Sequence, residues 1–169
     1  MESEKAFIDH SSELLREEFF PRIRMATEQL TDEQIWWRPN EASNSIGNLI
    51  LHLTGNVTQW IIGGVGNQPV VRDRQKEFDE RSVISGSELL AKLEQTLERV
   101  SEVLSELDAS SLMESRKIQG NDVTVLQAIY HVVEHFSMHT GQILLLTKII
   151  TAEDLRLYEF PAGAAKKKW

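Results

Sequence analysis

Three of the five histidines lie in one short run of the sequence, where His131, His135 and His139 are spaced four residues apart. On a helix with 3.6 residues per turn, this spacing stacks the imidazoles along one face. The residues from Val125 to Ile150 are strongly apolar, and a helix that is apolar nearly all round is a buried one. We therefore expect the histidines inside the fold, where imidazoles could bind a metal ion.

Spacing alone leaves the choice of ligands open. Two imidazoles at positions i and i+4 can reach one ion, but His131 and His139 are two turns apart, roughly 12 Å along the axis, which is too far. The pair is therefore either His131 with His135 or His135 with His139. Each histidine could instead be satisfied by a neighbour in the core, as a lone buried histidine usually is.

A third imidazole is expected on a helix that begins after Asn44 or Ser45 and runs to about Ile62. This segment is apolar except for one narrow polar stripe, whose residues follow each other at steps of three and four. The stripe consists of Ser45, Asn48, His52, Asn56 and Gln59. A polar face on so apolar a helix has to be satisfied, and a metal or a bound ligand would do so. With two histidines of the run, His52 would form a three-histidine set that leaves one position for water or substrate.

Four polar residues are candidates for supporting the histidines or contacting a substrate: Asn48, Asn56, Glu134 and Gln142. Glu134 could equally be an exposed helix residue. No Glu-x-x-His occurs, which disfavours a di-iron carboxylate site, and no His-Glu-x-x-His occurs, which excludes the common zinc-protease helix. The run from Gly63 to Gly66 lacks the later glycine of a dinucleotide fingerprint, and we expect it to end the second helix.

Four long helices must position these residues. The first spans about residues 4–30 with a kink or break near Pro21, the second about 45–62, the third opens at Ser85, and the fourth runs from Thr124 to about Thr151. Residues 67–85 form a long, charge-rich connection between the second and third helices, of a kind that often serves as a lid or binding loop. No convincing strand pattern occurs.

These elements predict an all-α four-helix bundle over residues 1–151, followed by a C-terminal tail, 152–169. Simple up-down-up-down topology does not follow, because the connection between the second and third helices is long.

Composition narrows the function classes. The chain has 169 residues, enough for one domain with its own core, and no cysteine, which excludes disulfides, thiolate ligands and a protein-borne sulfur nucleophile. A net charge of -8 disfavours nucleic-acid binding. We see no signal peptide and no apolar run long enough to span a bilayer, so we expect no membrane contact and a cytoplasmic location.

Four segments also carry a family likeness: residues 30–39 (LTDEQIWWRP), 44–52 (NSIGNLILH), 72–78 (RDRQKEF) and 135–142 (HFSMHTGQ). In this order and spacing they resemble the DinB/YfiT-like superfamily of metalloenzymes, also called the DinB family. The likeness covers the chain from the first helix to the fourth.

The resemblance implies a four-helix bundle with a divalent ion, nickel or zinc, bound by His52, His135 and His139, and it leaves His131 outside the ligand set. It also implies a homodimer. Family members commonly have an arginine where this sequence has Thr140, so any substrate or partner contact of that arginine would be missing here.

Characterised members of the superfamily include transferases that use low-molecular-weight thiols such as bacillithiol or mycothiol. The resemblance therefore implies a metal-dependent enzyme of the thiol S-transferase type acting on a small-molecule substrate. The lack of cysteine is compatible with this, because the thiol would be a substrate. The alternatives are a metal-dependent hydrolase, a metal- or ligand-binding bundle without catalysis, and a structural bundle whose histidines are satisfied internally.

Overall fold

The computed structural model describes residues 2–159 and 165–167. Seven α-helices form most of this part of the chain: α1 (Glu2–Glu13), α2 (Phe20–Thr27), α3 (Asp32–Ile35), α4 (Ile46–Val57), α5 (Arg74–Asp79), α6 (Gly86–Glu106) and α7 (Val125–Thr151). Two π-helical segments and one 3-10 segment continue or connect them: η1 (Leu14–Phe19), η2 (Thr58–Val65) and η3 (Ala109–Met113). Two short antiparallel pairs complete the description: β1 (Ser115–Ile118) with β2 (Asn121–Thr124), and β3 (Tyr158–Glu159) with β4 (Lys166–Lys167). The predicted all-α bundle is confirmed, with short strands that the sequence analysis did not anticipate.

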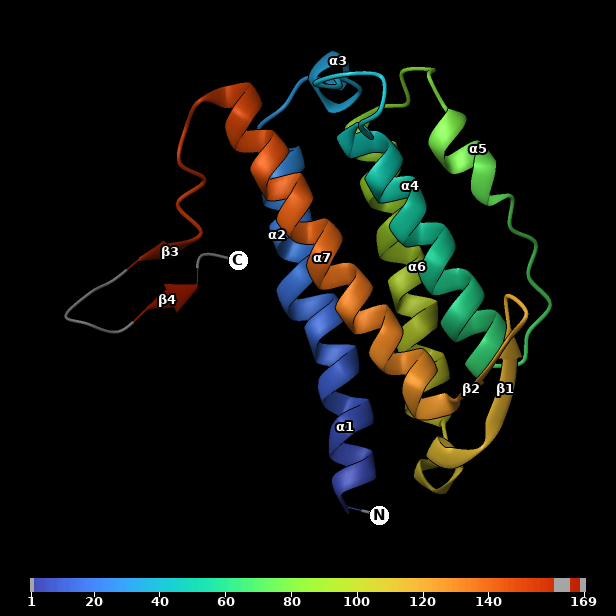
Figure 1. Ribbon diagram of the computed structural model, residues 1–169. Coiled ribbons are helices and arrows are strands. Elements are labelled where there is room, and N and C mark those ends of the chain that lie inside the picture. The colour runs from blue at the N-terminus through green and yellow to red at the C-terminus, as the bar shows by residue number, and fades with distance from the viewer. Residues whose placement is uncertain (1, 160–164, 168–169) are drawn as a thin grey trace.

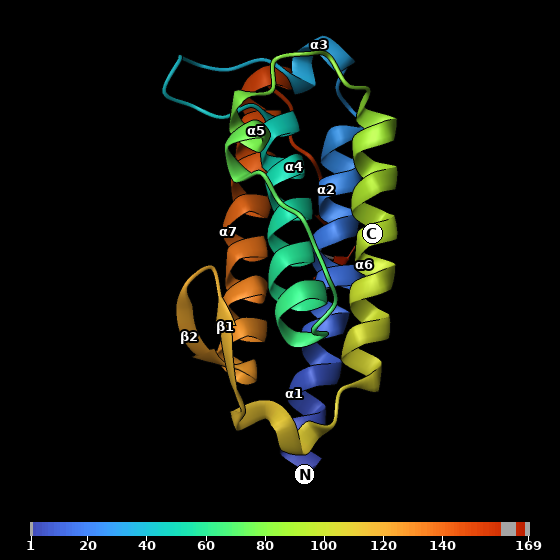
Figure 2. The ribbon, with the colours of Figure 1, turned by 90° about the vertical axis from the view of Figure 1, so that its right-hand side faces the viewer.

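The bundle has four long members: α1 with η1 and α2, α4 with η2, α6, and α7 (Figure 1). The first member packs against α6 and α7, and α4 packs against the same two helices from the other side. The first and last members run in one direction, whereas α4 and α6 both run in the opposite direction (Figures 1 and 2). The topology is therefore up-down-down-up.

This topology explains the long connection that the sequence predicted. Because α4 and α6 are parallel, the chain has to return along the bundle before α6 can begin. A helix from Ile46 to Val65 is about 30 Å long. Residues 67–85, which we call the strap, make this return beside α4 and contain α5 (Figure 2). Asp73 caps α5 by accepting a hydrogen bond from the backbone N–H of Lys76 at 3.3 Å.

The break expected near Pro21 appears as a change in helical register. The chain remains helical, but η1 ends at Phe19 and α2 starts at Phe20, so that Pro21 lies in the first turn of α2. Proline has no N–H, and the first turn of a helix needs none. The π-helical segment thus absorbs the effect of the proline without turning the chain away from the bundle.

The second helix begins and ends as predicted. Ser45 and Asn48 form a reciprocal capping box at its start. The run from Gly63 to Gly66 ends the helix, as predicted: η2 reaches Val65, and Gly66 is its C-cap. A Cβ atom at Gly64 would lie only 2.8 Å from Cγ1 of Ile118, so this glycine lets the β1–β2 hairpin approach the helix closely.

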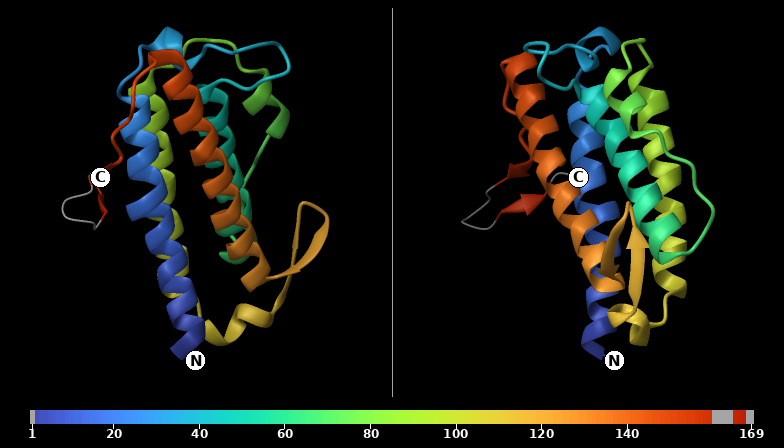
Figure 3. Two further views of the ribbon diagram at one scale, coloured as in Figure 1. Left: turned by 60° about the vertical axis from the view of Figure 1, so that its left-hand side comes forward. Right: turned by 45° about the vertical axis from the view of Figure 1, so that its right-hand side comes forward.

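That hairpin lies in a segment whose sequence shows no convincing strand pattern. Its turn is formed by Gln119 and Gly120, which have φ angles of +52° and +81°. Two-residue hairpin turns of this kind require positive φ at both positions, and asparagine or aspartate usually precedes the glycine. Ile118 is buried against η2, and the hairpin lies on the opposite side of the bundle from the β3–β4 pair (Figure 3).

The fourth long helix matches the prediction. Thr124 and Gln127 form a reciprocal capping box, and α7 ends at Thr151. Residues 160–164, 168 and 169 of the predicted tail lie outside the described residues, and the domain boundary at residue 151 stays a prediction. None of the helices in the described ranges combines the length and hydropathy that crossing a bilayer requires.

Candidate metal centre

The structure brings the three predicted histidines together between α4 and α7. His52 and His139 are buried, and His135 is half-buried. The Nε2 atom of His135 lies 3.0 Å from Nε2 of His52 and 3.1 Å from Nε2 of His139. Each ring thus offers one nitrogen to a common point, and the three offered nitrogens lie within 4.8 Å of one another.

Two of the rings are held in the tautomer that a metal ligand needs. Nδ1 of His52 lies 2.9 Å from Oε2 of Glu77, and Nδ1 of His139 lies 2.6 Å from Oε1 of Gln142. Both partners are acceptors, so each Nδ1 carries the hydrogen and each Nε2 keeps its lone pair. Nδ1 of His135 is buried and has no hydrogen-bond partner among the described residues.

His135 and His139 are electrostatically suited to stay neutral. Burial, followed by the nearby His139 and His52, lowers the pKa of His135 from 6.5 to about 3. Burial also lowers the pKa of His139, although its hydrogen bond to Gln142 opposes the change. Neutral imidazoles are the form that binds metal, so protons compete weakly for this site at neutral pH.

The donor set fits a divalent ion. Zinc–nitrogen bonds of about 2.0–2.1 Å in a tetrahedral site place the ligand nitrogens about 3.3 Å apart. Two of the three pairs are close to this value, at 3.0 and 3.1 Å, and all three nitrogens lie within 4.8 Å of one another. Without an ion, the Nε2 lone pairs of His52 and His139 both face Nε2 of His135. That nitrogen can donate at most one hydrogen, so one of the two lone pairs has no donor. An ion accepts all three lone pairs at once.

A carboxylate from the strap forms a second layer behind His52. Glu77 accepts hydrogen bonds from Arg72, with Nε to Oε1 at 2.6 Å and Nη2 to Oε2 at 2.8 Å. Burial alone would raise the pKa of Glu77, but the hydrogen bonds from Arg72 and His52 outweigh it and lower the pKa. The sequence analysis missed both residues as site residues. Their signal was their place in the segment 72–78 that carries the family likeness, because charge alone does not distinguish them among the many charged residues of the loop.

The four residues predicted to support the histidines lie in different parts of the structure, and not all of them contact the histidine cluster. Gln142 contacts His139, as described above. Asn48 lies behind the cluster, where its Nδ2 donates to the backbone carbonyl of Glu77 at 2.8 Å. Asn56 is buried beside His131, and Glu134 is exposed on the outer face of α7.

His131 lies one turn from His135 and outside the converging set. Its Nε2 is 3.4 Å from Nδ2 of Asn56, and its ring packs against that of Trp60, with 4.2 Å between centroids and the planes tilted by 43°. A set with His131 in place of His139 therefore does not converge, because the nitrogens that meet in the described structure belong to His52, His135 and His139. Thr140 is buried, and its hydroxyl has no partner among the described residues. The position of the family arginine thus faces the bundle interior here.

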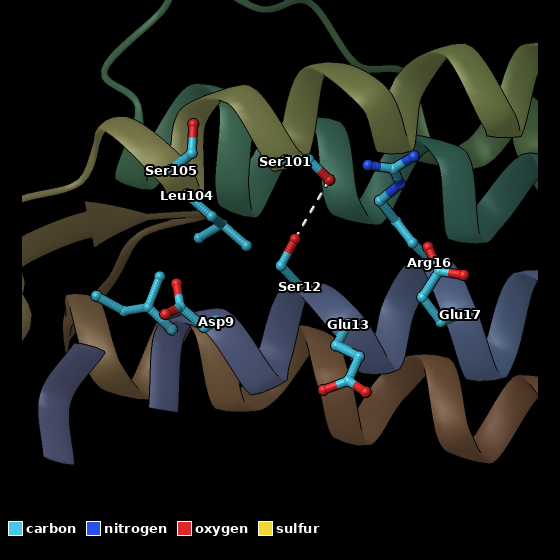
Figure 4. Close-up of a pocket in the computed structure, with 9 residues that line it drawn as sticks. Asp9, Ser12, Glu13, Arg16, Glu17, Ser101, Leu104 and Ser105 are labelled. Carbon is cyan, nitrogen blue, oxygen red and sulfur yellow. Dashed lines mark hydrogen bonds between the residues drawn. The ribbon is translucent and has the colours of Figure 1, made fainter. Parts of the chain in front are cut away.

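A separate cavity of about 290 Å³ lies between α1 and α6 (Figure 4). Ser12 and Ser101 approach each other across it at 3.2 Å, and Asp9, Glu13 and Arg16 lie around them. None of the three converging histidines lines this cavity.

Comparisons with known proteins agree with this architecture. Over residues 5–164 the chain matches the family described as "Protein of unknown function (DUF1572)". No curated protein matches it. The fold is similar to that of a conserved protein from Enterococcus faecalis, with a TM-score of 0.69 and 16% identity over 86% of this chain and 97% of that one. It is also similar to a DinB-like protein from Bacillus cereus, with a TM-score of 0.64 and 16% identity over 79% of this chain and 86% of that one. The chain therefore belongs to the DUF1572 family and has the DinB-like bundle fold that its sequence pattern predicted.

Proposed function

We propose that this protein binds a divalent metal ion, nickel or zinc, through His52, His135 and His139, and that it is an enzyme of the thiol S-transferase type. The observation that carries the proposal is the meeting of three imidazole Nε2 atoms, two of which belong to rings whose Nδ1 hydrogen is already donated. Three imidazoles leave a fourth position free in a tetrahedral site. When bound, such an ion lowers the pKa of a thiol or water in that position.

The residues of the chain prepare the site for this chemistry. Glu77 and Gln142 orient two of the imidazoles, and burial keeps the rings of His135 and His139 neutral. The sequence contains no cysteine, so a sulfur nucleophile has to come from a small-molecule thiol. The same site with water in the fourth position would act as a hydrolase, and the assays below separate the two activities.

Metal content tests the first half of the proposal. Protein purified without a histidine tag should contain about one ion per chain, and the His52→Ala variant should contain little. His10→Ala is the matched control, because His10 is exposed on α1 and hydrogen-bonds to Glu13. Equal and low metal content in the native protein and in His52→Ala would refute metal binding.

An activity assay tests the second half of the proposal, the thiol S-transferase activity. A panel of low-molecular-weight thiols is offered with an electrophilic acceptor, with and without a chelator, and consumption of the thiol is followed. Chelator-sensitive thiol transfer is the expected result. Metal-dependent cleavage of esters or amides without thiol transfer would favour a hydrolase function. A metal-loaded protein that turns over none of these substrates would be a metal-binding protein without catalysis.

We also propose a homodimer. Met138, Leu145 and Ile149 are exposed and lie on one face of α7. Exposed Trp37 borders the same surface beside Ile149. An apolar stripe of this kind supports an interface with a second copy. Light scattering should give twice the chain mass, and Leu145→Glu should give the monomer; a monomeric native protein would refute the proposal.

A further inference from the structure

The strap carries an ion pair that is almost completely buried against α4. The side chains of Arg72 and Glu77 are 5% and 11% exposed. Arg72 spans the network, because it holds both carboxylate oxygens of Glu77 and also donates Nη1 to Oε1 of Gln59 at 2.9 Å. Burying two charges is costly even when they are paired, so a pair of this kind points to a role in orientation more than in stability.

Two groups of opposite character compete for Nδ1 of His52. Oε2 of Glu77, at 2.9 Å, can only accept a hydrogen bond, and Nη2 of Arg72, at 3.2 Å, can only donate one. With the carboxylate in place, the hydrogen stays on Nδ1 and Nε2 faces the other histidines with its lone pair. Without the carboxylate, the guanidinium would donate to Nδ1, and the hydrogen of the neutral ring would move to Nε2. That nitrogen could then no longer bind an ion.

The carboxylate has a second effect, on charge. A guanidinium beside His52 would repel a cation held by the histidines. Glu77 offsets this positive charge at hydrogen-bond distance. Loss of Glu77 would therefore harm a metal site in two ways, through the tautomer and through the unbalanced charge of Arg72.

The room for this pair comes from Gly55, which lies one turn after His52 on α4. A Cβ atom there would lie 2.8 Å from Cδ of Glu77 and 2.9 Å from Nε of Arg72, and closer still to Oε1. Both groups are fixed by the hydrogen bonds described above, so a methyl group has to displace them. Glycine inside a helix costs stability relative to alanine, and here the close approach of the ion pair accounts for it.

We propose that Glu77 is a positioning residue that holds His52 in its metal-binding tautomer, that Arg72 fixes Glu77, and that Gly55 admits the pair. The strap is then a third element of the site, beside α4 and α7. This inference rests on the proposed metal function, but its first test does not need a metal.

The first experiment reads the tautomer of His52 in the metal-free protein by long-range proton–nitrogen NMR of ¹⁵N-labelled histidine. The native protein should carry the hydrogen on Nδ1. In Glu77→Ala the hydrogen should move to Nε2, and Gly55→Ala, which keeps both charges, should lose the single Nδ1–H state. A folded Glu77→Ala with an unchanged tautomer would overturn the inference, and Gly55→Ala decides the case if Glu77→Ala does not fold.

The second experiment measures zinc affinity by competition with a chromophoric chelator. Glu77→Ala and Gly55→Ala should each bind zinc about 10–100-fold more weakly. Adding Arg72→Leu to Glu77→Ala should restore much of the affinity, because the competing donor and its charge are gone. Glu77→Gln, which can still accept from Nδ1, should lose less than Glu77→Ala.

Gly141→Ala is the matched control, because Gly141 lies on α7 with no atom within 4 Å of an added Cβ. Its affinity should equal that of the native protein. Affinities of Glu77→Ala and Gly55→Ala within twofold of the native value would overturn the inference. If the native protein binds no zinc, the metal proposal fails, while the tautomer experiment still decides the role of Glu77.

Discussion

Zinc should raise the thermal stability of the native protein, and replacing His52 by alanine should remove most of the increase. His52 and His135 are 83 residues apart in the sequence, so only the folded chain brings the three nitrogens together. The unfolded chain retains His135 and His139 at a spacing of four residues, which can share an ion only weakly. An ion that binds the native state more tightly than the unfolded state stabilises the native state by mass action.

The size of the effect follows from this linkage. At a free zinc concentration of 100 times the dissociation constant, the stabilisation is about 2.7 kcal/mol. For a chain of 169 residues, each kcal/mol shifts the melting temperature by about 2–4 °C. The expected increase is therefore roughly 5–11 °C, less whatever the unfolded chain gains by binding zinc through its remaining histidine pair.

The assay is a set of melting curves recorded by circular dichroism, with zinc and with a chelator. The native protein should show the full shift, and His52→Ala and His139→Ala should show little. His131→Ala should keep the shift, because His131 lies outside the converging nitrogens and contacts Trp60 and Asn56 instead.

Two results would refute this reasoning. An equal shift in the native protein and in His52→Ala would mean that zinc binds elsewhere. Loss of the shift in His131→Ala, with the shift kept in His139→Ala, would mean that the ligand pair is His131 with His135.

Three further outcomes follow from the structure. The pKa of His135 is about 3 in the folded protein and near 6.5 in the unfolded chain, so the unfolded chain takes up a proton first as the pH falls. The free energy of unfolding of the metal-free protein should therefore fall as the pH drops from 7 toward 4. In urea titrations, His135→Gln should flatten this pH dependence. Ser45→Ala should cost about 2 kcal/mol, the upper end for a helix cap, because the backbone N–H of fully buried Asn48 loses its acceptor. Thr124→Ala, at a half-buried cap, should cost about 1 kcal/mol in the same titrations. Phe136→Ala should cost about 3–5 kcal/mol, since its side chain is fully buried, and a loss below 1 kcal/mol would contradict its place in the core.

Much of the fold is encoded in short stretches of sequence. A capping box needs only residues three positions apart, so the starts of α4 and α7 at Ser45 and Thr124 could be predicted. The apolar periodicity of the long helices is likewise local, and it determines the four-helix bundle. The spacing of His135 and His139 follows from helical geometry alone, and the polar stripe pointed to His52 before any packing was known.

Features that depend on contacts between distant residues could not be predicted in this way. The glycines after Ile62 mark the end of the second helix, but the local pattern does not show that Gly64 makes room for Ile118, more than fifty residues away. The long connection before α6 left the topology open, and only the structure shows that α4 and α6 are parallel. Local patterns give the extent of a helix but not its direction in the bundle.

The sequence by itself determined the bundle and which residue types could bind a metal. Tertiary structure decided which of them meet, because the packing of α4 on α7 brings His52 to His135 and His139 and leaves His131 aside. It also decided the role of Glu77. In the sequence Glu77 is one charge among many in a polar loop, and only the return of the strap past Gly55 buries its carboxylate against His52.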